Sequence, residues 1–247
     1  MDAVETVLNI SAYRFTPIAD PVALRLHLLA RAREHQLLGT ILLATEGINL
    51  FLAGAADGVR AFMRELSSQP GLQDLQGKES WSALPPFRRL LVKVKREIIR
   101  MDQPQVNPAA ERAAAVAPQT LRQWLERGID DEGRPVVMLD TRNAFEVAHG
   151  RFRGAIDWGL QRFGDFPEAA RQHREQLAGK TIVSYCTGGI RCEKAALYLR
   201  DIGVERVLQL DGGILKYFED TDAAHFDGTC FVFDERMALD GQLASVR

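Results

Sequence analysis

The 247-residue sequence has little cysteine, almost no net charge and no long apolar run. Three cysteines, an odd number in a long chain, do not make the disulfide framework of a secreted protein, so we expect a reducing cytoplasm. A net charge of −2 does not mark the whole chain as a polyanion-binding protein. A local basic face is still compatible with that charge.

Two kinds of membrane-directed segment are also missing. The longest apolar stretches fall well short of the roughly 18 residues that a membrane-spanning helix needs. The first residues, "MDAVETVLNISAY", have neither a basic start nor an apolar centre, so they do not read as a signal peptide. Hydrophobic residues make up 46% and charged residues 26%, which is typical of a globular protein, and the length favours two domains over one.

The first hundred residues alternate between strand and helix patterns. The order β-α-β-β-α-β predicts a ferredoxin-like (acylphosphatase-like) α+β domain over residues 1–102. An aspartate followed by proline, Asp20-Pro21, is typical of a helix start. The strands are expected at 6–15, 39–47, 48–54 and 88–100, and the helices at 20–37 and 55–69.

A proline-containing stretch without a periodic apolar stripe, residues 103–118, is predicted to be a linker. Strand and helix patterns alternate again over 119–220, which predicts a second domain, an α/β domain with a parallel sheet. A more polar tail follows at 221–247. The strands of the second domain are expected at 134–142, 181–186 and 206–213, and the helices at 118–129, 167–177, 192–202 and 213–220.

The stretch "CTGGIRC" follows the strand at 181–186 and places a thiol where ligand sites of parallel sheets lie. Glycines allow successive N–H groups to turn inward around an anion, and the helix behind them adds its positive end. Arg191 adds a full charge. We expect this loop to keep Cys186 ionised; the alternative is a buried cysteine beside an ordinary turn. The loop residues between the two charged groups are Thr187, Gly188, Gly189 and Ile190.

Four further residues of the second domain need an interpretation. Two alternatives are open for three of them, and the fourth has one. Asp140 and Arg142 end a strand and either orient the loop or form a structural ion pair, which we favour. Cys192 is either a resolving thiol for Cys186 or a buried residue of the first helical turn. Cys230 is expected to be a packing residue. The cysteine spacing argues against a zinc site, and the sequence has no flavin or metal motif.

Basic residues are concentrated on and around the strand expected at 88–100. Alternation of Val92 and Val94 with lysines would give this strand one apolar and one basic face. A basic face of this kind binds RNA phosphates or is simply solvated. The RNA-binding candidates are Arg88, Arg89, Lys93, Lys95 and Arg96.

Three segments of the second half resemble the rhodanese family. "CTGGIR" is similar to the active-site loop of rhodanese-type sulfurtransferases, and "LQLDGGILKYFE" resembles their closing motif. "VVMLDTRNAFEVAHGRFRGAI" resembles their signature, here with Asp140, Arg142, Glu146, Gly150 and Gly154-Ala155. The resemblance implies a rhodanese-like domain in which Cys186 carries a persulfide.

A narrower resemblance spans both halves of the chain. "YCTGGIRCEKA", "GTILLATEGIN" and "PFRRLLVKVKREII" are similar to bacterial tRNA uridine-34 hydroxylases of the short form, without a cysteine-rich C-terminal region. This resemblance implies oxygen-dependent conversion of uridine to 5-hydroxyuridine in the tRNA anticodon stem-loop, with Cys186 essential and dioxygen as co-substrate. It also makes Asn49 a candidate for contact with a base.

Two other functions explain part of the same sequence. A plain sulfurtransferase would move sulfane sulfur through a Cys186 persulfide, but it leaves the first domain without a role. A non-catalytic RNA-binding or redox module would use Cys186 and Cys192 as a switch.

Overall fold

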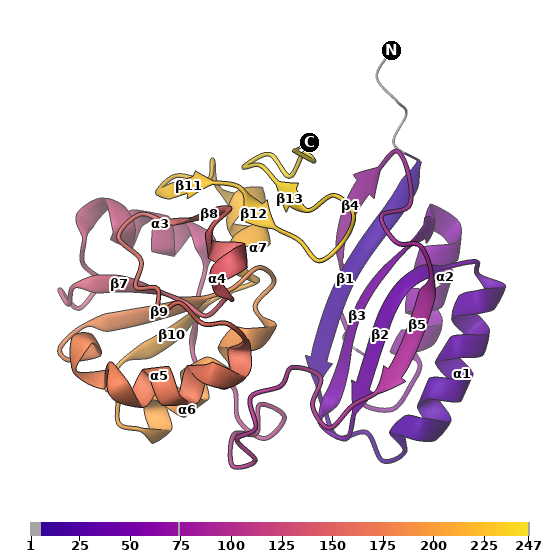
Figure 1. The fold of residues 1–247 in the computed structure, drawn as a ribbon, viewed down its shortest axis with the longest axis horizontal. Coiled ribbons are helices and arrows are strands. Elements are labelled where there is room, and N and C mark those ends of the chain that lie inside the picture. Colours follow the sequence, from indigo (N-terminus) through magenta and orange to yellow (C-terminus); the bar gives the residue numbers. More distant parts are fainter. Residues whose placement is uncertain (1–5, 74, 247) are drawn as a thin grey trace. The chain divides into compact units, whose positions relative to one another are not determined.

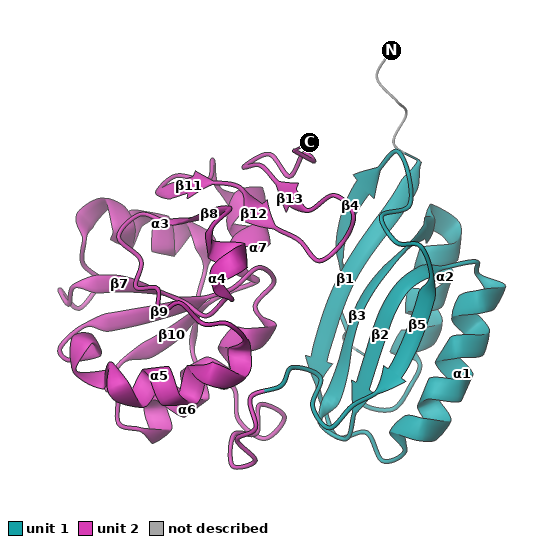
Figure 2. Cartoon of the chain, in the orientation of Figure 1, with its two compact units in different colours: residues 1–100 teal, residues 101–247 magenta. Residues whose placement is uncertain are grey.

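The computed structural model describes residues 6–73 and 75–246, which form two units, Met1–Arg100 and Met101–Arg247 (Figures 1 and 2). Each unit has its own sheet and its own apolar core. In the described parts of both units, every helix is too short or too polar to cross a lipid bilayer.

The first unit is a five-stranded mixed sheet in the order β4-β1-β3-β2-β5, with two helices on one face (Figure 1). The pairings among β1, β2, β3 and β4 are antiparallel, and β5 joins β2 in parallel. The elements are β1 (Val7–Phe15), α1 (Pro21–Glu34), β2 (Leu38–Ala44), β3 (Gly47–Ala55), α2 (Ala56–Ser67), β4 (Lys78–Ser82) and β5 (Leu90–Val94).

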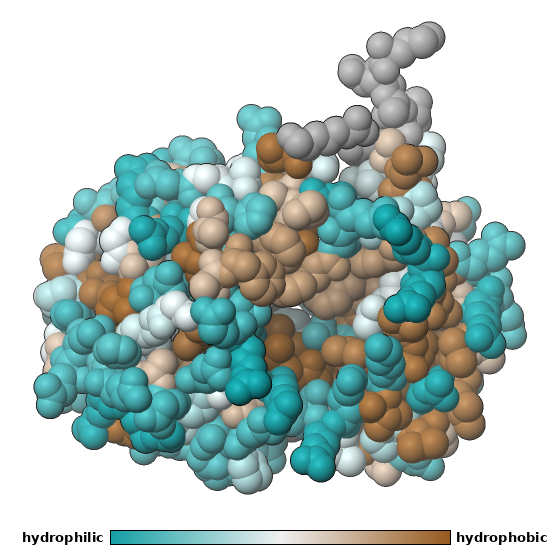
Figure 3. Space-filling model, viewed as in Figure 1, coloured by the Kyte–Doolittle hydropathy of each residue, from teal (hydrophilic) through white to brown (hydrophobic). Residues whose placement is uncertain are grey.

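The start of α1 follows from its first two residues. Oδ1 of Asp20 accepts hydrogen bonds from the backbone N–H groups of Val22 (3.0 Å) and Ala23 (2.9 Å), and Pro21 occupies the first turn. The helix buries Leu28 and Ala32 against the sheet. Its outer side keeps apolar residues exposed, and hydrophobic atoms are visible over α1 in the space-filling view (Figure 3).

The strand that completes the β-α-β-β-α-β order is β4, and the prediction that residues 88–100 complete it was wrong. β4 has the sequence KESWS, which is mostly polar and only partly buried, so it lacks the apolar alternation that predicts strands. Within 88–100, only Leu90–Val94 forms a strand, at the edge beside β2. Val92 faces the core there and Leu90 packs against it, whereas Val94 is 38% exposed, so the expected apolar face of this strand ends before Val94.

The second unit is built on a four-stranded sheet in the order β6-β10-β9-β7, and all three pairings are parallel, which confirms the predicted parallel sheet. Helices α3 and α7 lie on one face, and α5 and α6 lie on the other (Figure 1). The elements to this point are β6 (Ala115–Val116), α3 (Pro118–Arg127), β7 (Val136–Asp140), α4 (Ala144–Val147), β8 (Gly150–Phe152), α5 (Phe166–Gln172), β9 (Thr181–Tyr185), α6 (Ile190–Asp201), β10 (Val207–Leu210) and α7 (Gly213–Asp220). Two short 3-10 helices are η1 (Phe163–Asp165) and η2 (Arg174–Leu177).

Segments expected to lack regular structure contribute short strands to this unit. β6 lies within residues 103–118 and pairs with β10, and Val106 and Ala113 of the same segment are buried. The tail contains β11 (Phe226–Gly228), which pairs with β8, and the hairpin of β12 (Cys230–Phe231) and β13 (Ala238–Leu239). Strands of two or three residues are too short to show the alternation that predicts a strand.

The register of the sheet brings two loops together. Asp140, the last residue of β7, pairs with Tyr185, the last residue of β9. The residues that follow, from Thr141 and from Cys186, therefore begin side by side at the carboxyl edge of the sheet. Every residue of β9 is buried, so this edge rests on a fixed core strand.

Candidate active site

The loop that carries Cys186 joins β9 to α6. The backbone N–H of Gly189 donates a hydrogen bond to the Cys186 sulfur, with an N···S distance of 3.1 Å. Gly189 has φ +102°, a conformation that strains any residue with a side chain. The positive end of the α6 dipole begins at the next residue. The sulfur thus faces a backbone donor, as an anion-holding loop requires.

The remaining loop residues differ in their surroundings. The φ of Gly188 lies outside the left-handed region, and a Cβ on it would meet open space, so glycine is not sterically required there. Thr187 Oγ1 donates to the carbonyl of Phe231 at 3.4 Å and to Glu146 Oε1 at 3.5 Å. Ile190 is the first residue of α6.

The pKa of Cys186 is lowered although the residue is only 1% exposed. Burial by itself raises the pKa of a thiol. The Cys192 thiol, the charge of Arg191 and the backbone N–H groups of Arg191 and Gly189 all act in the opposite direction and together lower it to about 5. At neutral pH the sulfur is therefore a thiolate, the form that reacts as a nucleophile.

Arg191 is held by an ion pair with Glu146 of α4. Its two terminal nitrogens lie 2.6 and 2.7 Å from the two carboxylate oxygens, and both side chains are nearly or fully buried. Glu146 also accepts a hydrogen bond from the backbone N–H of Asn143 at 3.1 Å, which ties its carboxylate to the start of α4. The guanidinium therefore has one fixed position next to the loop.

Cys192 lies in the first turn of α6 and is fully buried. Burial, together with the neighbouring Cys186, raises the pKa of Cys192 well above that of a free thiol. Its sulfur is 3.7 Å from Thr141 Oγ1, which itself donates to the carbonyl of Tyr185 at 2.9 Å. Cys192 thus keeps its proton and donates it in a hydrogen bond to the Cys186 sulfur.

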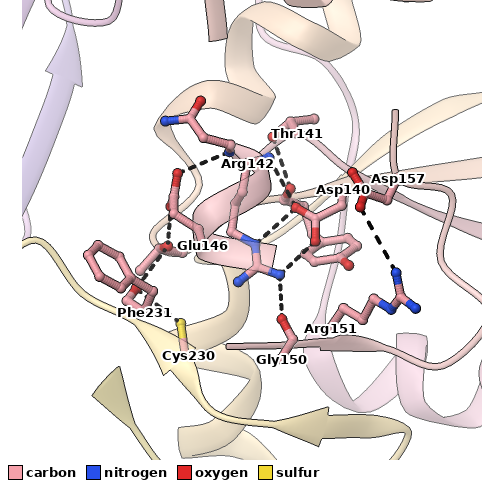
Figure 4. Close-up of polar contacts among 12 residues, drawn as sticks. Asp140, Thr141, Arg142, Glu146, Gly150, Arg151, Asp157, Cys230 and Phe231 are labelled. Atoms are coloured by element: carbon pink, nitrogen blue, oxygen red, sulfur yellow. Dashed lines mark hydrogen bonds and ion pairs between the residues drawn. The ribbon is translucent and has the colours of Figure 1, made fainter. Parts of the chain in front are cut away.

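Asp140 and Arg142 form a buried ion pair, and neither is more than 1% exposed (Figure 4). Nε and one terminal nitrogen of Arg142 lie 2.9 and 2.6 Å from the two Asp140 oxygens, and that nitrogen also donates to the carbonyl of Gly150 at 2.7 Å. These contacts tie the end of β7 to the start of β8. They place the pair in the framework beneath the loop.

The first turn of α7 clamps the loop from the other side. The N–H groups of Ile214 and Leu215 donate to the carbonyls of Cys186 and Thr187, at 3.0 and 3.1 Å. Gly213 makes this approach possible, because a Cβ on it would lie 2.5 Å from the Cys186 carbonyl oxygen and 2.8 Å from that of Thr187. Gly213 thereby determines how closely α7 supports the loop.

The RNA-binding candidates of the first unit divide into two groups. Asn49 is 7% exposed in β3, and its amide nitrogen donates to the carbonyl of Ile98 at 3.4 Å. The sheet thus holds the Asn49 side chain, and its contact with a base stays a prediction. The five basic candidates are all exposed: Arg88, Arg89, Lys93, Lys95 and Arg96.

Cys230 is fully buried, and burial raises its pKa to about 12. It packs in the apolar core of the second unit, near Arg142 (Figure 4). In the described residues, His, Cys, Asp and Glu side chains do not gather in groups of three that could hold a metal ion.

Sequence reasoning missed the roles of Glu146 and Gly213. Both lie in motifs that the rhodanese resemblance singled out, but no local pattern pairs Glu146 with Arg191, which is 45 residues away. The paired glycines at 212–213 were a usable signal, because adjacent glycines often mark a close backbone approach.

Comparison with protein families matches both units. Residues 7–98 match the UPF0176 acylphosphatase like domain, and residues 121–220 match the rhodanese-like domain. These matches confirm the fold class predicted for the two halves of the chain.

Several curated proteins are similar over nearly the whole chain. A tRNA uridine(34) hydroxylase of Bordetella pertussis is 63% identical over 238 residues, covering 96% of this chain and 98% of that protein. Proteins of the same name from Delftia acidovorans and Ralstonia nicotianae are 60% and 52% identical, again over 96% of this chain, and over 90% and 84% of their own lengths.

The contact at Gly213 predicts different effects for two glycines with the same backbone conformation. Gly179 and Gly213 have nearly equal φ values, +70° and +67°, so alanine at either position adds the same backbone strain. At 213 the new Cβ meets loop backbone, whereas at 179 it meets open space. Gly213→Ala should therefore lower the free energy of unfolding by about 1–3 kcal/mol more than Gly179→Ala, measured by urea denaturation. Equal losses would contradict the clamp.

The charge of Arg191 predicts a pH effect at Cys186. Arg191→Met should raise the Cys186 pKa by about 1–3 pH units, because the thiolate loses an adjacent positive charge. The measurement is a titration of the ultraviolet absorbance of the thiolate, corrected with the Cys186→Ser protein. An unchanged pKa would show that the guanidinium does not stabilise the thiolate.

A paired variant separates this effect from lost stability. Arg191→Met leaves Glu146 buried without its partner, whereas the Glu146→Gln/Arg191→Met protein does not, so the double variant should regain stability while the Cys186 pKa stays raised. The pKa of Cys186 is lower in the folded chain than in the unfolded chain. The thiolate therefore contributes to stability, in full at pH values above the ordinary pKa of a thiol. That stabilisation is lost as the pH falls toward 5, and the double variant should lose it at a higher pH.

Proposed function

The chain belongs to the tRNA uridine(34) hydroxylase family, and on this premise we propose that it converts uridine at the wobble position of tRNA to 5-hydroxyuridine. The observation that carries the proposal is identity of 63% to a protein of that name over nearly the full length of both chains. A tRNA substrate also supports a cytoplasmic location.

We assign the essential role to Cys186. All three cysteines lie in the described residues, and Cys186 alone has a lowered pKa, whereas those of Cys192 and Cys230 are raised. Reactive cysteines are distinguished from packing cysteines by this property. Arg191 and the Gly189 amide support the charge, and Glu146 and Gly213 act as positioning residues through them.

The oxygen atom in this proposal comes from dioxygen. One oxygen atom enters the hydroxyl group that replaces the hydrogen on C5 of uridine. The other oxygen atom leaves as water. The balance requires two electrons and two protons, which we assign to a thiol reductant that is oxidised to its disulfide. The exposed fraction of Cys186 is 1%, so a reactant as small as dioxygen reaches the sulfur with less opening of the loop than a nucleotide needs.

Cys192 takes the role of a resolving thiol. If Cys186 is oxidised to a sulfenic acid, the Cys192 thiol attacks its sulfur, a disulfide forms, and water leaves. The hydrogen bond between the two sulfurs supports this assignment, because the attacking group is already in contact with its target. The disulfide prevents irreversible oxidation until a thiol reduces it.

The anticodon stem-loop is proposed to bind through the exposed basic residues of the first unit. Their charges suit phosphates of the RNA backbone, with affinity that falls as the salt concentration rises. The group comprises Arg88, Arg89, Lys93, Lys95 and Arg96.

The deciding experiment measures modified nucleosides by mass spectrometry in tRNA from a deletion strain that carries plasmid copies of the gene. The unaltered gene should restore 5-hydroxyuridine, and Cys186→Ala should leave it at the level of the deletion. Cys230→Ala is the matched control, since it removes a buried thiol outside the loop, and it should restore the modification. Restoration by Cys186→Ala would refute the essential thiol.

Two further outcomes test the reaction class. In a purified reaction under isotopically labelled dioxygen, the label should appear in the new hydroxyl group; label derived from water would exclude dioxygen as the source. Loss of a thiolated nucleoside in the deletion strain, with 5-hydroxyuridine intact, would favour the sulfurtransferase. An unchanged nucleoside profile would favour the non-catalytic module.

A further inference from the structure

Three phenylalanines form an aromatic cluster in the second unit. Phe145 comes from α4, Phe231 from β12, and Phe233 from the segment that follows β12. The ring centroid of Phe231 lies 5.2 Å from that of Phe145 and 5.2 Å from that of Phe233, and each pair meets edge to face. We call these three residues the aromatic platform. Such contacts hold the rings in a fixed arrangement.

Much of the platform remains uncovered. Phe145 and Phe233 are each 49% exposed, although phenylalanine is a residue that cores usually bury. The side chains are anchored, because Phe231 is partly buried and packs at 5.2 Å from the His149 ring. A fixed, half-exposed aromatic group is suited to stack a flat partner with little loss of conformational freedom.

The platform is continuous with the loop of the candidate active site. The guanidinium carbon of Arg191 lies 6.0 Å from the centroid of the Phe233 ring. Thr187, the residue after Cys186, donates its hydroxyl to the carbonyl of Phe231. Phe145 directly precedes Glu146, the partner of Arg191. Helix α4 therefore carries both one ring of the platform and the partner of the charge beside the thiolate.

We propose that the aromatic platform stacks an unstacked nucleobase of the anticodon loop, one that flanks the uridine undergoing modification. The inference rests on the proposed function and adds a binding subsite to it. A uridine that presents C5 to the loop must leave its stack, and its neighbour loses a stacking partner. Aromatic side chains replace that partner and accept any base, because every base has a π face.

The position of the platform favours a nucleobase over an apolar protein surface. It consists of three rings at the rim of a loop that holds a thiolate and an ion pair, rather than a broad aliphatic patch. A nucleobase beside the reacting uridine reaches this rim, whereas a stable protein partner buries about 800 Å² of each surface, more than three rings provide. A second copy of this chain on the platform is therefore an outcome of the test.

The experiment measures the affinity of the full chain for a fluorescein-labelled anticodon stem-loop RNA with uridine at the wobble position, by anisotropy. Phe145→Ala/Phe233→Ala should weaken binding by about 10-fold or more, the size of effect that loss of base stacking produces. Phe233→Tyr should bind within about 2-fold of the unaltered chain, since it keeps the ring, whereas Phe233→Leu should lose affinity as Phe233→Ala does. The matched control is Ile129→Ala. Ile129 is an apolar residue that is 40% exposed, at the amino-terminal edge of the sheet of the second unit.

Salt dependence distinguishes stacking from charge. Removal of a stacking contact should lower affinity at every salt concentration and leave the slope of log Kd against log salt unchanged, while Lys93→Ala/Lys95→Ala should reduce that slope. In steady-state hydroxylation, Phe233→Leu should raise KM with little change in kcat. Circular dichroism should show that each variant is folded.

Each other result has a defined meaning. Unchanged affinity in Phe145→Ala/Phe233→Ala, or equal binding by the Tyr and Leu variants, would overturn the subsite and leave the hydroxylase proposal standing. An unaltered chain that binds no stem-loop would overturn both. Loss of self-association in sedimentation, with RNA affinity intact, would show that the platform is an interface between copies of the chain and refute the proposal.

Discussion

The ionisation of Cys186 depends on where one buried guanidinium is held. Arg191 and Glu146 are nearly or fully buried, and neither would be stable in its place without the other. The pair therefore serves two purposes: it compensates the burial of both charges, and it fixes a positive group beside the sulfur. Because Glu146 belongs to α4, the charge on the α6 side of the loop is positioned by the segment that follows β7.

The surrounding contacts make the loop an integral part of the sheet edge. Thr141 bonds to the end of β9, the Asp140–Arg142 pair secures the end of β7, and the first turn of α7 bonds to the loop carbonyls. A thiolate needs donors that do not have to reorganise when charge appears, and rigid support from three elements provides them.

Much of this architecture is predictable from sequence where the signal is local. The buried run of β9, the glycines and the cysteine predict a strand, a turn and an anion-holding loop without any tertiary information. β4 was missed because KESWS has no apolar alternation, and its place in the sheet comes from pairing with β1. Asn49 was a candidate through the resemblance alone, and its burial in β3 has no signal in the local sequence.

Contacts between distant segments could not be predicted in the same way. Glu146 and Arg191 are 45 residues apart, and the aromatic platform joins α4 to the tail that follows β11. Neither arrangement has a periodicity of its own. The ion pair arises only when β7 and β9 lie side by side, and the platform only when β11 pairs with β8 and brings the tail to α4.

The unequal pKa values of the two neighbouring thiols have an electrochemical consequence. At neutral pH Cys186 has already given up its proton and Cys192 has retained one, so oxidation of the pair to a disulfide releases two electrons and one proton. The midpoint potential of the pair should then fall by about 30 mV for each unit by which the pH rises, half the change that an ordinary dithiol shows. A drop in pH therefore raises the midpoint potential of this pair less than that of an ordinary dithiol in the same solution.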